Sequence, residues 1–431
     1  MRVINSFDDL LSYLSSLKHP TFVVNDKHYQ WPLDSMRRLD QYLGSPSQKL
    51  KVIHIAGTNG KGSCCNFIAT ALIANGFKVG TYTSPQLFDI RERIRINGEL
   101  ISEEDIISLA QQILITANAN ASIKISSYSE VFVEMAFLYF YAKNVDIAIV
   151  ETGIGGKLDP TNIIETPLIS VITSIGLAHT ELFGESVYRI TAEKCGIIKK
   201  HSPVVVGYVN DDIKQQIKQY AEKVSSSVYF SDELYPTITD TQIESNFDFD
   251  LSGYYQLRNI KTTLSTLWLL NKTYPNIFHQ FNHIKTIQTL KETSKIMNFR
   301  GRWEVISNKP KIIVDVCDNA QGIELNMKQL EMMYDTQYKR LVIILGLTSS
   351  RKLSIKKYLP TNAFYIYTEA KSYIKSRELA KEIGLPGIIT DSVKDAIKYY
   401  KCNSKSDDLV YIGGSIHVVS EALSCFKEIF S

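Results

Sequence analysis

The sequence predicts an α/β protein with two doubly wound domains, the first larger than the second. Short, continuous apolar runs alternate with helical runs along most of the chain, which is typical of parallel sheets covered by helices on both faces. With 431 residues, the chain is also too long for one ordinary core. The alternation pauses at the polar stretch 299–304 and then restarts, so we expect domains at 1–298 and 299–431.

The composition is that of an ordinary globular protein, with 44% apolar and 22% charged residues. The net charge of +3, from 48 basic and 45 acidic residues, gives no support for a nucleic-acid or membrane-surface partner. There is no N-terminal apolar signal region and no apolar run of about 18 residues, so we expect a cytoplasmic protein. The six cysteines form no C-x-x-C pair, which favours reduced thiols over structural zinc.

The first domain is expected to contain a parallel sheet preceded by helices. A helix is predicted over 7–17, capped by Asn5 and Ser6, and another over 36–43. Five apolar runs predict strands, at 50–55, 78–83, 145–150, 168–175 and 204–207. The accompanying helices are predicted at 66–75, from 102 onward, at 129–141, around 193–198 and at 253–270.

The second domain repeats the alternation on a smaller scale. Its strand candidates are 311–316, 341–345, 364–367, 387–390 and 409–412. Helices are predicted between them at 327–333 and 376–383. No internal repeat or low-complexity segment interrupts either domain.

A polar stretch at 89–98 follows the second expected strand, and its arginines alternate with apolar residues. As structure alone, Arg91, Arg93 and Arg95 predict a solvated hairpin at the edge of a sheet. As function, the same side chains can meet an anionic substrate or order a flap. The sequence leaves both interpretations open.

The loop 57–63 is the strongest functional signal in the chain. It reads Gly-Thr-Asn-Gly-Lys-Gly-Ser and stands between an expected strand and an expected helix. Glycines let backbone N–H groups converge on an anion, and the helix N-terminus adds partial positive charge. Lys61 can reach outer phosphates and the Ser63 hydroxyl can hold magnesium, although a glycine separates the two, unlike in the common phosphate loop. The alternative is a tight turn with a solvated lysine, but the context favours a P-loop ATPase domain.

Three further polar residues follow expected strands. Ser84, Glu151 and His179 each stand just beyond the end of an apolar run. In doubly wound sheets, ligands bind beyond the carboxyl ends of the strands. One at a time, Glu151 is more typical of a capping group and His179 of a loop histidine. Together they offer magnesium a hydroxyl, a carboxylate and an imidazole.

From about residue 30 to the C-terminus, the ordered motifs resemble folylpolyglutamate synthase and the bifunctional dihydrofolate synthase of the Mur ligase superfamily. The stretches that carry the likeness are 57–63, 83–85, Glu151 with 153–162, 179–184, 193–198, Gly253 with Gln256 and Asn259, Arg302, Asp315 with Asn319, and 413–421. The resemblance implies a Rossmann-like second domain and an ATP-dependent ligase, which we expect to be a monomer. Such an enzyme activates the carboxylate of dihydropteroate or a folate as an acyl phosphate, and the nitrogen of L-glutamate then attacks it.

The resemblance also implies roles for individual residues. The ATP-binding positions would be Gly57, Thr58, Asn59, Gly60, Lys61, Gly62, Ser63, Asn259, Arg302 and Asp315. Magnesium would be held by Ser63, Ser84, Glu151 and His179. The catalytic positions would be Lys61, Lys194 and His179, and the substrate-binding positions Arg93, Asp159 and Asp318. The lysine that matches Lys194 is carbamylated by carbon dioxide in this family, and the alternative here is a surface pair of Lys194 with Glu193.

Several positions depart from the family pattern. Ala178 stands where the family usually has aspartate, and Lys157 where it has arginine. In the second domain, the usual Asp-Gly-Ala-His-Asn is Asp-Val-Cys-Asp-Asn at 315–319. A later Asp-Lys-Asp run is Ser-Arg-Lys at 350–352. The first-domain set is therefore almost intact, whereas the second-domain set has changed.

The change at Asp318 leaves more than one function open. A carboxylate there disfavours anionic phosphate or glutamate unless Arg351 or Lys352 compensates. The leading hypothesis is a working ligase with an altered amine acceptor. The runner-up is a catalytically impaired paralogue that binds nucleotide. A ligase acting on a cell-wall precursor ranks last, because the chain lacks the N-terminal nucleotide-sugar domain expected there.

Overall fold

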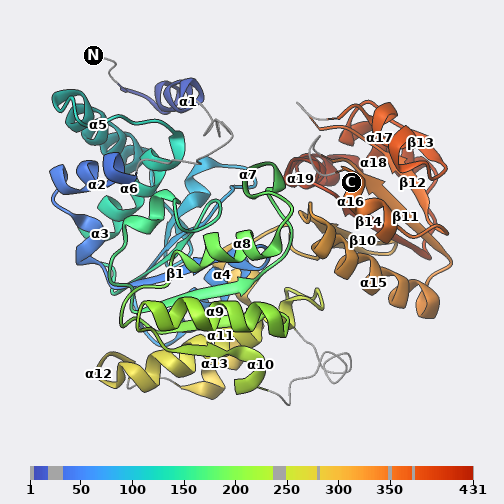
Figure 1. Ribbon diagram of the computed structural model, residues 1–431. Helices are drawn as coiled ribbons and strands as arrows, with labels where there is room; N and C mark the ends of the chain where they lie inside the picture. The colour runs from blue at the N-terminus through green and yellow to red at the C-terminus, as the bar shows by residue number, and fades with distance from the viewer. Residues whose placement is uncertain are drawn as a thin grey trace. The chain divides into compact units, whose positions relative to one another are not determined.

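The computed structural model describes residues 4–17, 33–235, 249–278, 282–347, 352–370 and 374–430. The chain divides into two compact units, each with its own sheet and covering helices (Figure 1). The first unit comprises Met1–Thr239 with Arg258–Asn298, and the second Asp240–Leu257 with Phe299–Ser431. This architecture confirms the predicted fold class of two doubly wound α/β units.

Within its described residues, the first unit has an eight-stranded sheet in the order β4-β3-β2-β5-β1-β6-β7-β8. The strands from β2 to β8 in that order run parallel, whereas β3 and β4 form an antiparallel edge hairpin. Their bounds are β1 Val52–Ala56, β2 Val79–Tyr82, β3 Ile94–Ile96, β4 Glu99–Leu100, β5 Ile147–Glu151, β6 Ile169–Ser174, β7 Val204–Tyr208 and β8 Val228–Phe230. The β3–β4 hairpin lies at the arginine-rich stretch, where an edge hairpin was one of the two interpretations, and β8 is an addition to the five predicted strands.

Helices and 3-10 turns surround this sheet (Figure 1). They are α1 Phe7–Ser16, α2 Leu33–Tyr42, α3 Pro46–Lys49, α4 Lys61–Ala74, η1 Ile90–Arg93, α5 Glu103–Ala119, α6 Tyr128–Ala142, η2 Pro160–Ile163, α7 Thr180–Phe183, α8 Val187–Cys195, α9 Asp211–Lys223, α10 Ser231–Leu234, α11 Gln256–Thr273, α12 Pro275–Phe278, α13 His283–Leu290 and α14 Thr293–Met297. In the described residues, no helix is both long and apolar enough to cross a membrane.

The core explains why the central strands are continuous apolar runs. All five residues of β1 and of β5 are buried, because helices cover both faces of the sheet. One core joins Val52 and Val150 of these strands to α1, α5 and α6. Another joins Ile172 and Val206 to α8 and α9. This packing fixes the strand ends, from which the functional loops emerge.

The second unit has a six-stranded sheet in its described residues, in the order β13-β12-β11-β14-β10-β9. Only β9, at one edge, is antiparallel to its neighbour. The strands are β9 Glu304–Asn308, β10 Lys311–Asp315, β11 Arg340–Leu345, β12 Phe364–Tyr367, β13 Gly387–Ile389 and β14 Asp408–Gly413. The helices and 3-10 turn are α15 Ala320–Gln337, α16 Lys352–Ile355, η4 Lys356–Tyr358, α17 Ser376–Ile383, α18 Val393–Cys402 and α19 Ile416–Phe430.

The arginine-rich stretch forms the 3-10 turn η1 and the edge hairpin β3–β4, and the interpretation of it as solvated is wrong for Arg93 and Arg95. Arg93 and Arg95 are each only 6% exposed. Arg93 donates a hydrogen bond to Gln86 Oε1 (2.7 Å) and lies 5.0 Å from the centre of the Phe132 ring. Arg95 donates to the Asn298 carbonyl at the end of α14 (3.3 Å). The guanidinium groups are buried because they join segments that are distant in sequence.

Candidate active site

The predicted site residues of the first unit lie at one edge of its sheet. Four neighbouring strands, in the order β2-β5-β1-β6, end there. Ser84 follows β2, Glu151 ends β5, the loop 57–60 follows β1, and His179 follows β6. Because these strands are parallel, the topology gathers loops that are far apart in sequence.

The loop after β1 leads directly into α4, whose first residue is Lys61. Gly60, before the helix, has a φ of 86°, a left-handed conformation that favours glycine. A Cβ atom at Gly60 would also lie 2.1 Å from the Asn259 Oδ1 atom. The structure therefore brings Asn259, a predicted nucleotide ligand on α11, against the phosphate loop.

Two residues at the end of β6 anchor this loop, and the sequence analysis missed both. Thr173 Oγ1 donates to the Asn59 carbonyl (2.6 Å). Ser174 Oγ accepts a hydrogen bond from Asn59 N (3.0 Å), and the Ser174 carbonyl accepts one from Thr58 N (2.8 Å). The available signal was a pair of hydroxyl residues at the end of a mostly apolar strand, which by itself does not reveal the partner loop.

Lys61, Glu151 and Ser84 meet at the centre of the edge. Lys61 Nζ donates to the Gly57 carbonyl (3.1 Å) and lies 3.9 Å from Glu151 Oε1. The other carboxylate oxygen of Glu151 accepts a hydrogen bond from Ser84 N (3.2 Å). Glu151 is only 3% exposed, so its charge is held close to a cation and a backbone donor. The solvated lysine of the alternative interpretation is not what the structure contains.

Lys194 on α8 is also buried, with 5% of its surface exposed. Its Nζ donates to the Gly57 carbonyl (2.8 Å). Burial, with a smaller contribution from the nearby Lys61 charge, lowers the pKa of Lys194 to about 7. The surface pair with Glu193 is therefore a wrong interpretation, because the Lys194 amine points into the phosphate loop. Burial likewise raises the pKa of the Glu193 carboxyl.

His179 is the cap residue just before the short helix α7 and adopts a left-handed conformation with a φ of 53°. Its Nδ1 atom lies 3.5 Å from Glu181 Oε1. Glu181 is a neighbouring carboxylate that the sequence analysis did not consider. The imidazole therefore lies beside a carboxylate of its own loop.

The Asp159 carboxylate accepts hydrogen bonds from residues of its own loop. Its Oδ2 atom accepts from Ile154 N (2.9 Å), and its Oδ1 atom accepts from the amide and the hydroxyl of Thr161 (3.0 and 2.5 Å). Burial raises the pKa of the Asp159 carboxyl, while these hydrogen bonds oppose that effect. Arg93, the other predicted substrate ligand of this unit, is held by the contacts described above. The roles of both in binding substrate stay predictions.

The predicted residues of the second unit lie near the end of β10. Asp315 is buried, and its Oδ2 atom accepts from the Tyr255 hydroxyl (2.6 Å) and from Trp303 N (2.8 Å). Its Oδ1 atom accepts from Cys317 N (2.8 Å). The guanidinium of Arg302 lies 5.1 Å from the centre of the Phe299 ring. Asp315 is thus part of a local polar network.

Asp318 stands one residue before the cap of α15. Asn319 is that cap, because its side chain accepts from Gly322 N (3.2 Å). A carboxylate just before an 18-residue helix is favoured by the helix dipole. The role of Asp318 in substrate binding stays a prediction. Of the altered loop 350–352, Ser350 and Arg351 lie outside the described residues, and Lys352 begins α16.

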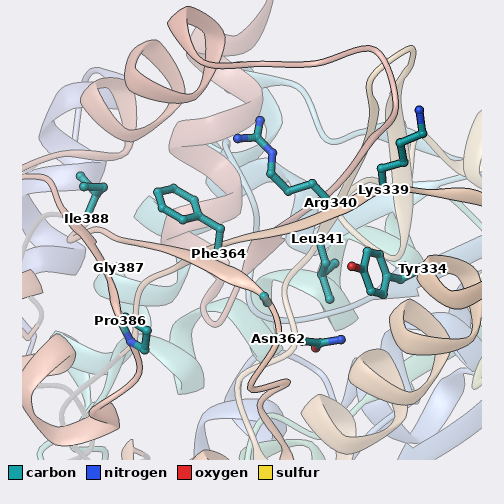
Figure 2. Close-up of a pocket in the computed structure, with 10 residues that line it drawn as sticks. Tyr334, Lys339, Arg340, Leu341, Asn362, Phe364, Pro386, Gly387 and Ile388 are labelled. Carbon is teal, nitrogen blue, oxygen red and sulfur yellow. The ribbon is translucent and has the colours of Figure 1, made fainter.

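The described residues contain no group of three or more histidines, cysteines, aspartates or glutamates placed to hold a metal ion. The predicted magnesium set contains only two such residues, Glu151 and His179, together with the hydroxyls of Ser63 and Ser84. A pocket of about 360 Å³ lies elsewhere, at the amino edge of β11, β12 and β13 (Figure 2). Its walls include Tyr334, and none of the predicted site residues lines it.

The model of the Mur ligase middle domain matches residues 55–265 of this chain. Fold and site thus define a Mur-type ligase with a phosphate loop after its first central strand. The chain is 30% identical over 411 residues to the dihydrofolate synthase/folylpolyglutamate synthase of Bacillus subtilis (strain 168), over 90% of this chain and 93% of that relative. It belongs to the dihydrofolate synthase/folylpolyglutamate synthase family.

Solved structures have the same two-unit fold. E. coli FolC in complex with DHPP and ADP has a TM-score of 0.83 at 23% identity, over 99% of both chains. The bifunctional folylpolyglutamate synthase/dihydrofolate synthase of Yersinia pestis, complexed with AMPPNP and a Mn ion, has a TM-score of 0.81 at 23% identity, over 98% of both chains. At these identities the likeness supports the fold.

Proposed function

We propose that this chain is an ATP-dependent ligase that joins L-glutamate to the carboxylate of dihydropteroate, a folate, or both, through an acyl phosphate. The observation that carries the proposal is that Lys61 and Lys194 both donate to the Gly57 carbonyl, with Glu151 beside Lys61. Two anions, the carboxylate and the γ-phosphate, must approach each other in this reaction. Cations and backbone donors fixed at one sheet edge offset that repulsion.

The residues have separate roles in this proposal. The loop 57–63 binds the phosphates, Lys61 stabilises the outer phosphate, and Asn259 contributes to the nucleotide site beside Gly60. Residues 1–298 form the ATP-binding domain and 299–431 the ligase domain, with Arg302 and Asp315 as nucleotide ligands of the latter. The enzyme acts as a monomer in the cytoplasm, with small molecules as its partners.

The donor set at the edge fits a magnesium ion. Glu151 supplies a buried carboxylate, Ser63 and Ser84 supply hydroxyls, and hard cations of this kind prefer oxygen ligands. His179 is the least typical member, because imidazole suits softer metals better. When bound, magnesium would neutralise phosphate charge. The Mn ion of the Yersinia pestis structure supports a divalent cation in this family.

Lys194 is proposed to carry a carbamate. Carbamylation joins carbon dioxide to the neutral amine and releases one proton, and a pKa of about 7 keeps much of this amine neutral near pH 7. The product is an anion in place of a cation. The buried position next to the phosphate loop supports this role, because a surface lysine would stay protonated.

Asp318 favours two alternatives to an ordinary glutamate ligase. The altered motif at 315–319 points to an amine acceptor other than L-glutamate, or to a catalytically impaired paralogue that binds nucleotide. Asp318 would then contribute to the acceptor site. A carboxylate there is unfavourable for the two carboxylates of glutamate.

ADP release tests these alternatives directly. We expect release with dihydropteroate plus glutamate to exceed release with ATP alone. Release only with another amino acid would support the altered acceptor. Nucleotide binding without release, across a panel of pterin acids and amino acids, would contradict the ligase and support the paralogue.

A further inference from the structure

His54 is a buried histidine that the sequence analysis did not consider. It lies in the middle of β1, three residues before the phosphate loop, and is 0% exposed. Its Nε2 atom is 2.9 Å from the hydroxyl of Thr161, on the turn η2. Its Nδ1 atom is buried and has no hydrogen-bond partner among the described residues. A buried polar group of this kind needs an explanation.

With the Asp159 carboxyl ionised, the Thr161 hydroxyl indicates which nitrogen of His54 carries the proton. That hydroxyl has one proton, and its oxygen lies 2.5 Å from Asp159 Oδ1, a length typical of a bond to a charged carboxylate. Because an ionised carboxylate only accepts, the hydroxyl proton belongs to this bond. His54 Nε2 must then donate to the Thr161 oxygen. Because the ring proton is then on Nε2, Nδ1 carries no proton and keeps a lone pair with no hydrogen-bond partner among the described residues.

The chain of hydrogen bonds continues into the glycine-rich turn 152–157. Asp159 accepts from Ile154 N on one oxygen and from Thr161 on the other. The turn then packs against α8: Lys157 N donates to the Glu193 carbonyl (2.7 Å), and a Cβ atom at Gly156 would lie 3.0 Å from the Lys194 Cα atom. A displacement of the turn would therefore also displace α8.

Lys194 connects α8 to the phosphate loop, because its Nζ donates a hydrogen bond to the Gly57 carbonyl. The contacts thus run from β1 through η2, the glycine-rich turn and α8 back to the residue after β1. His54 and Gly57 are three residues apart in the chain. The closed path links the predicted substrate residue Asp159 to the loop that would hold the nucleotide.

We infer that His54 and Thr161 are positioning residues, which hold Asp159 and the glycine-rich turn in the geometry that the pterin-acid substrate requires. This inference rests on the proposed ligase function for its kinetic consequence. Neither residue touches the reacting groups in this assignment. They act through two hydrogen bonds, one from His54 Nε2 to the Thr161 oxygen and one from the Thr161 hydroxyl to Asp159, which orient the Asp159 carboxylate. The ATP site keeps its own anchors, Thr173 and Ser174, and should be affected less.

The kinetic test compares Thr161→Val with Thr161→Ser. Valine removes the hydroxyl and keeps the shape, and we expect the KM for dihydropteroate to rise roughly tenfold, the scale of one hydrogen bond to a charged group, with the KM for ATP nearly unchanged. Serine restores the hydroxyl and should restore the KM. The matched control is Thr70→Val, because the Thr70 hydroxyl is buried and has no hydrogen-bond partner among the described residues.

Equal KM values for Thr161→Val and Thr70→Val would overturn the inference. So would an equal rise in the KM for ATP and for dihydropteroate, which a general structural defect would produce. If the wild-type chain releases no ADP with any substrate, the proposed function fails instead. The hydrogen-bond direction can then still be decided without activity.

Nitrogen NMR of histidine-labelled wild-type protein gives that second measurement. The His54 signal, identified by its loss in His54→Gln, should show a protonated Nε2 and a bare Nδ1. His54→Gln itself keeps an N–H donor and should preserve the KM for dihydropteroate better than His54→Leu. A proton on Nδ1 would overturn the assigned direction and, with it, the inference.

Discussion

The carboxyl edges of the two sheets use their charged residues differently. At the first, charged groups from separate loops meet: Lys61 lies beside Glu151, and Lys194 reaches Gly57. At the second, the buried carboxylate of Asp315 bonds to Tyr255 and to nearby backbone N–H groups. The first edge is organised for a ligand with several negative charges. At the second edge, Asp315 matches the family motif but its contacts lie within a local network, and Asp318, three residues later, departs from that motif.

This difference shows that two questions must be asked separately: whether a motif is present in the sequence, and whether its residues still have the motif's role. The sequence of the first edge predicts phosphate chemistry, and the contacts there support it. The sequence of the second edge departs from the family pattern at 315–319, where Asp318 directly precedes the Asn319 cap of α15. Retention of a motif and retention of its role therefore need separate tests.

The largest effect is expected from Glu151→Gln, which keeps the size of the side chain and removes its charge. Losing the carboxylate should lower activity by about 100-fold or more, because loss of a group that only supports a metal ligand already costs about 10- to 100-fold. His179→Ala should act on the same ion, so the two losses should combine less than additively in a double-mutant cycle of ADP release. Glu165→Gln, at an exposed carboxylate, is the control. Fully additive losses would mean that Glu151 and His179 do not share a metal.

Lys61→Ala should lower ATP affinity or turnover by about tenfold or more, because one charge-assisted hydrogen bond is worth roughly 1.5–3 kcal/mol. Lys51→Ala removes an exposed lysine just before β1 and should have little effect. Nucleotide titration measures the ATP affinity, and ADP release measures the turnover. Unchanged ATP use in the Lys61 variant would remove the phosphate loop from the mechanism and end the contrast between the edges.

Asp318→His should raise glutamate use by about fivefold, because removing a repulsion of roughly 1 kcal/mol at a partly exposed site corresponds to that factor. ATP binding should change little. Asp318→Asn separates the loss of charge from the gain of an imidazole, and Asp335→His controls for a histidine elsewhere on α15. The measurement is the glutamate dependence of ADP release.

A wild-type chain that ligates glutamate efficiently, with a lower rate in Asp318→His, would contradict the altered-acceptor idea. Asp318 would then be a functional replacement for the family's histidine. In a paralogue without turnover, glutamate-dependent release should stay at background in both proteins.

The smallest effect concerns stability. Burial lowers the pKa of Lys194 from 10.5 to about 7, so between these values the unfolded chain holds a proton that the folded chain lacks. The free energy of unfolding should therefore rise with pH across this window. Lys194→Met should flatten that rise, measured by urea unfolding in carbon-dioxide-free buffer, whereas Lys200→Met should not. Parallel curves for wild type and Lys194→Met would contradict a neutral buried amine.

The sequence by itself determined the fold class and the strand ends. Buried parallel strands such as β1 and β5 must be apolar on both faces, so they stand out as continuous runs. The loop 57–63 was recognisable because its glycines, lysine and serine are adjacent in the chain. The sequence also located Glu151 and Ser84, since both directly follow predicted strands.

Tertiary structure alone decided what those residues contact. The burial of Arg95, the anchoring of Asn59 by Thr173, and the path from His54 to Asp159 all join segments far apart in sequence. Residues 249–257, placed by sequence within the first domain, belong by their contacts to the second compact unit, where Tyr255 meets Asp315. Periodicity reports which face of an element is buried, but the partner of a polar side chain is set by the packing of whole elements.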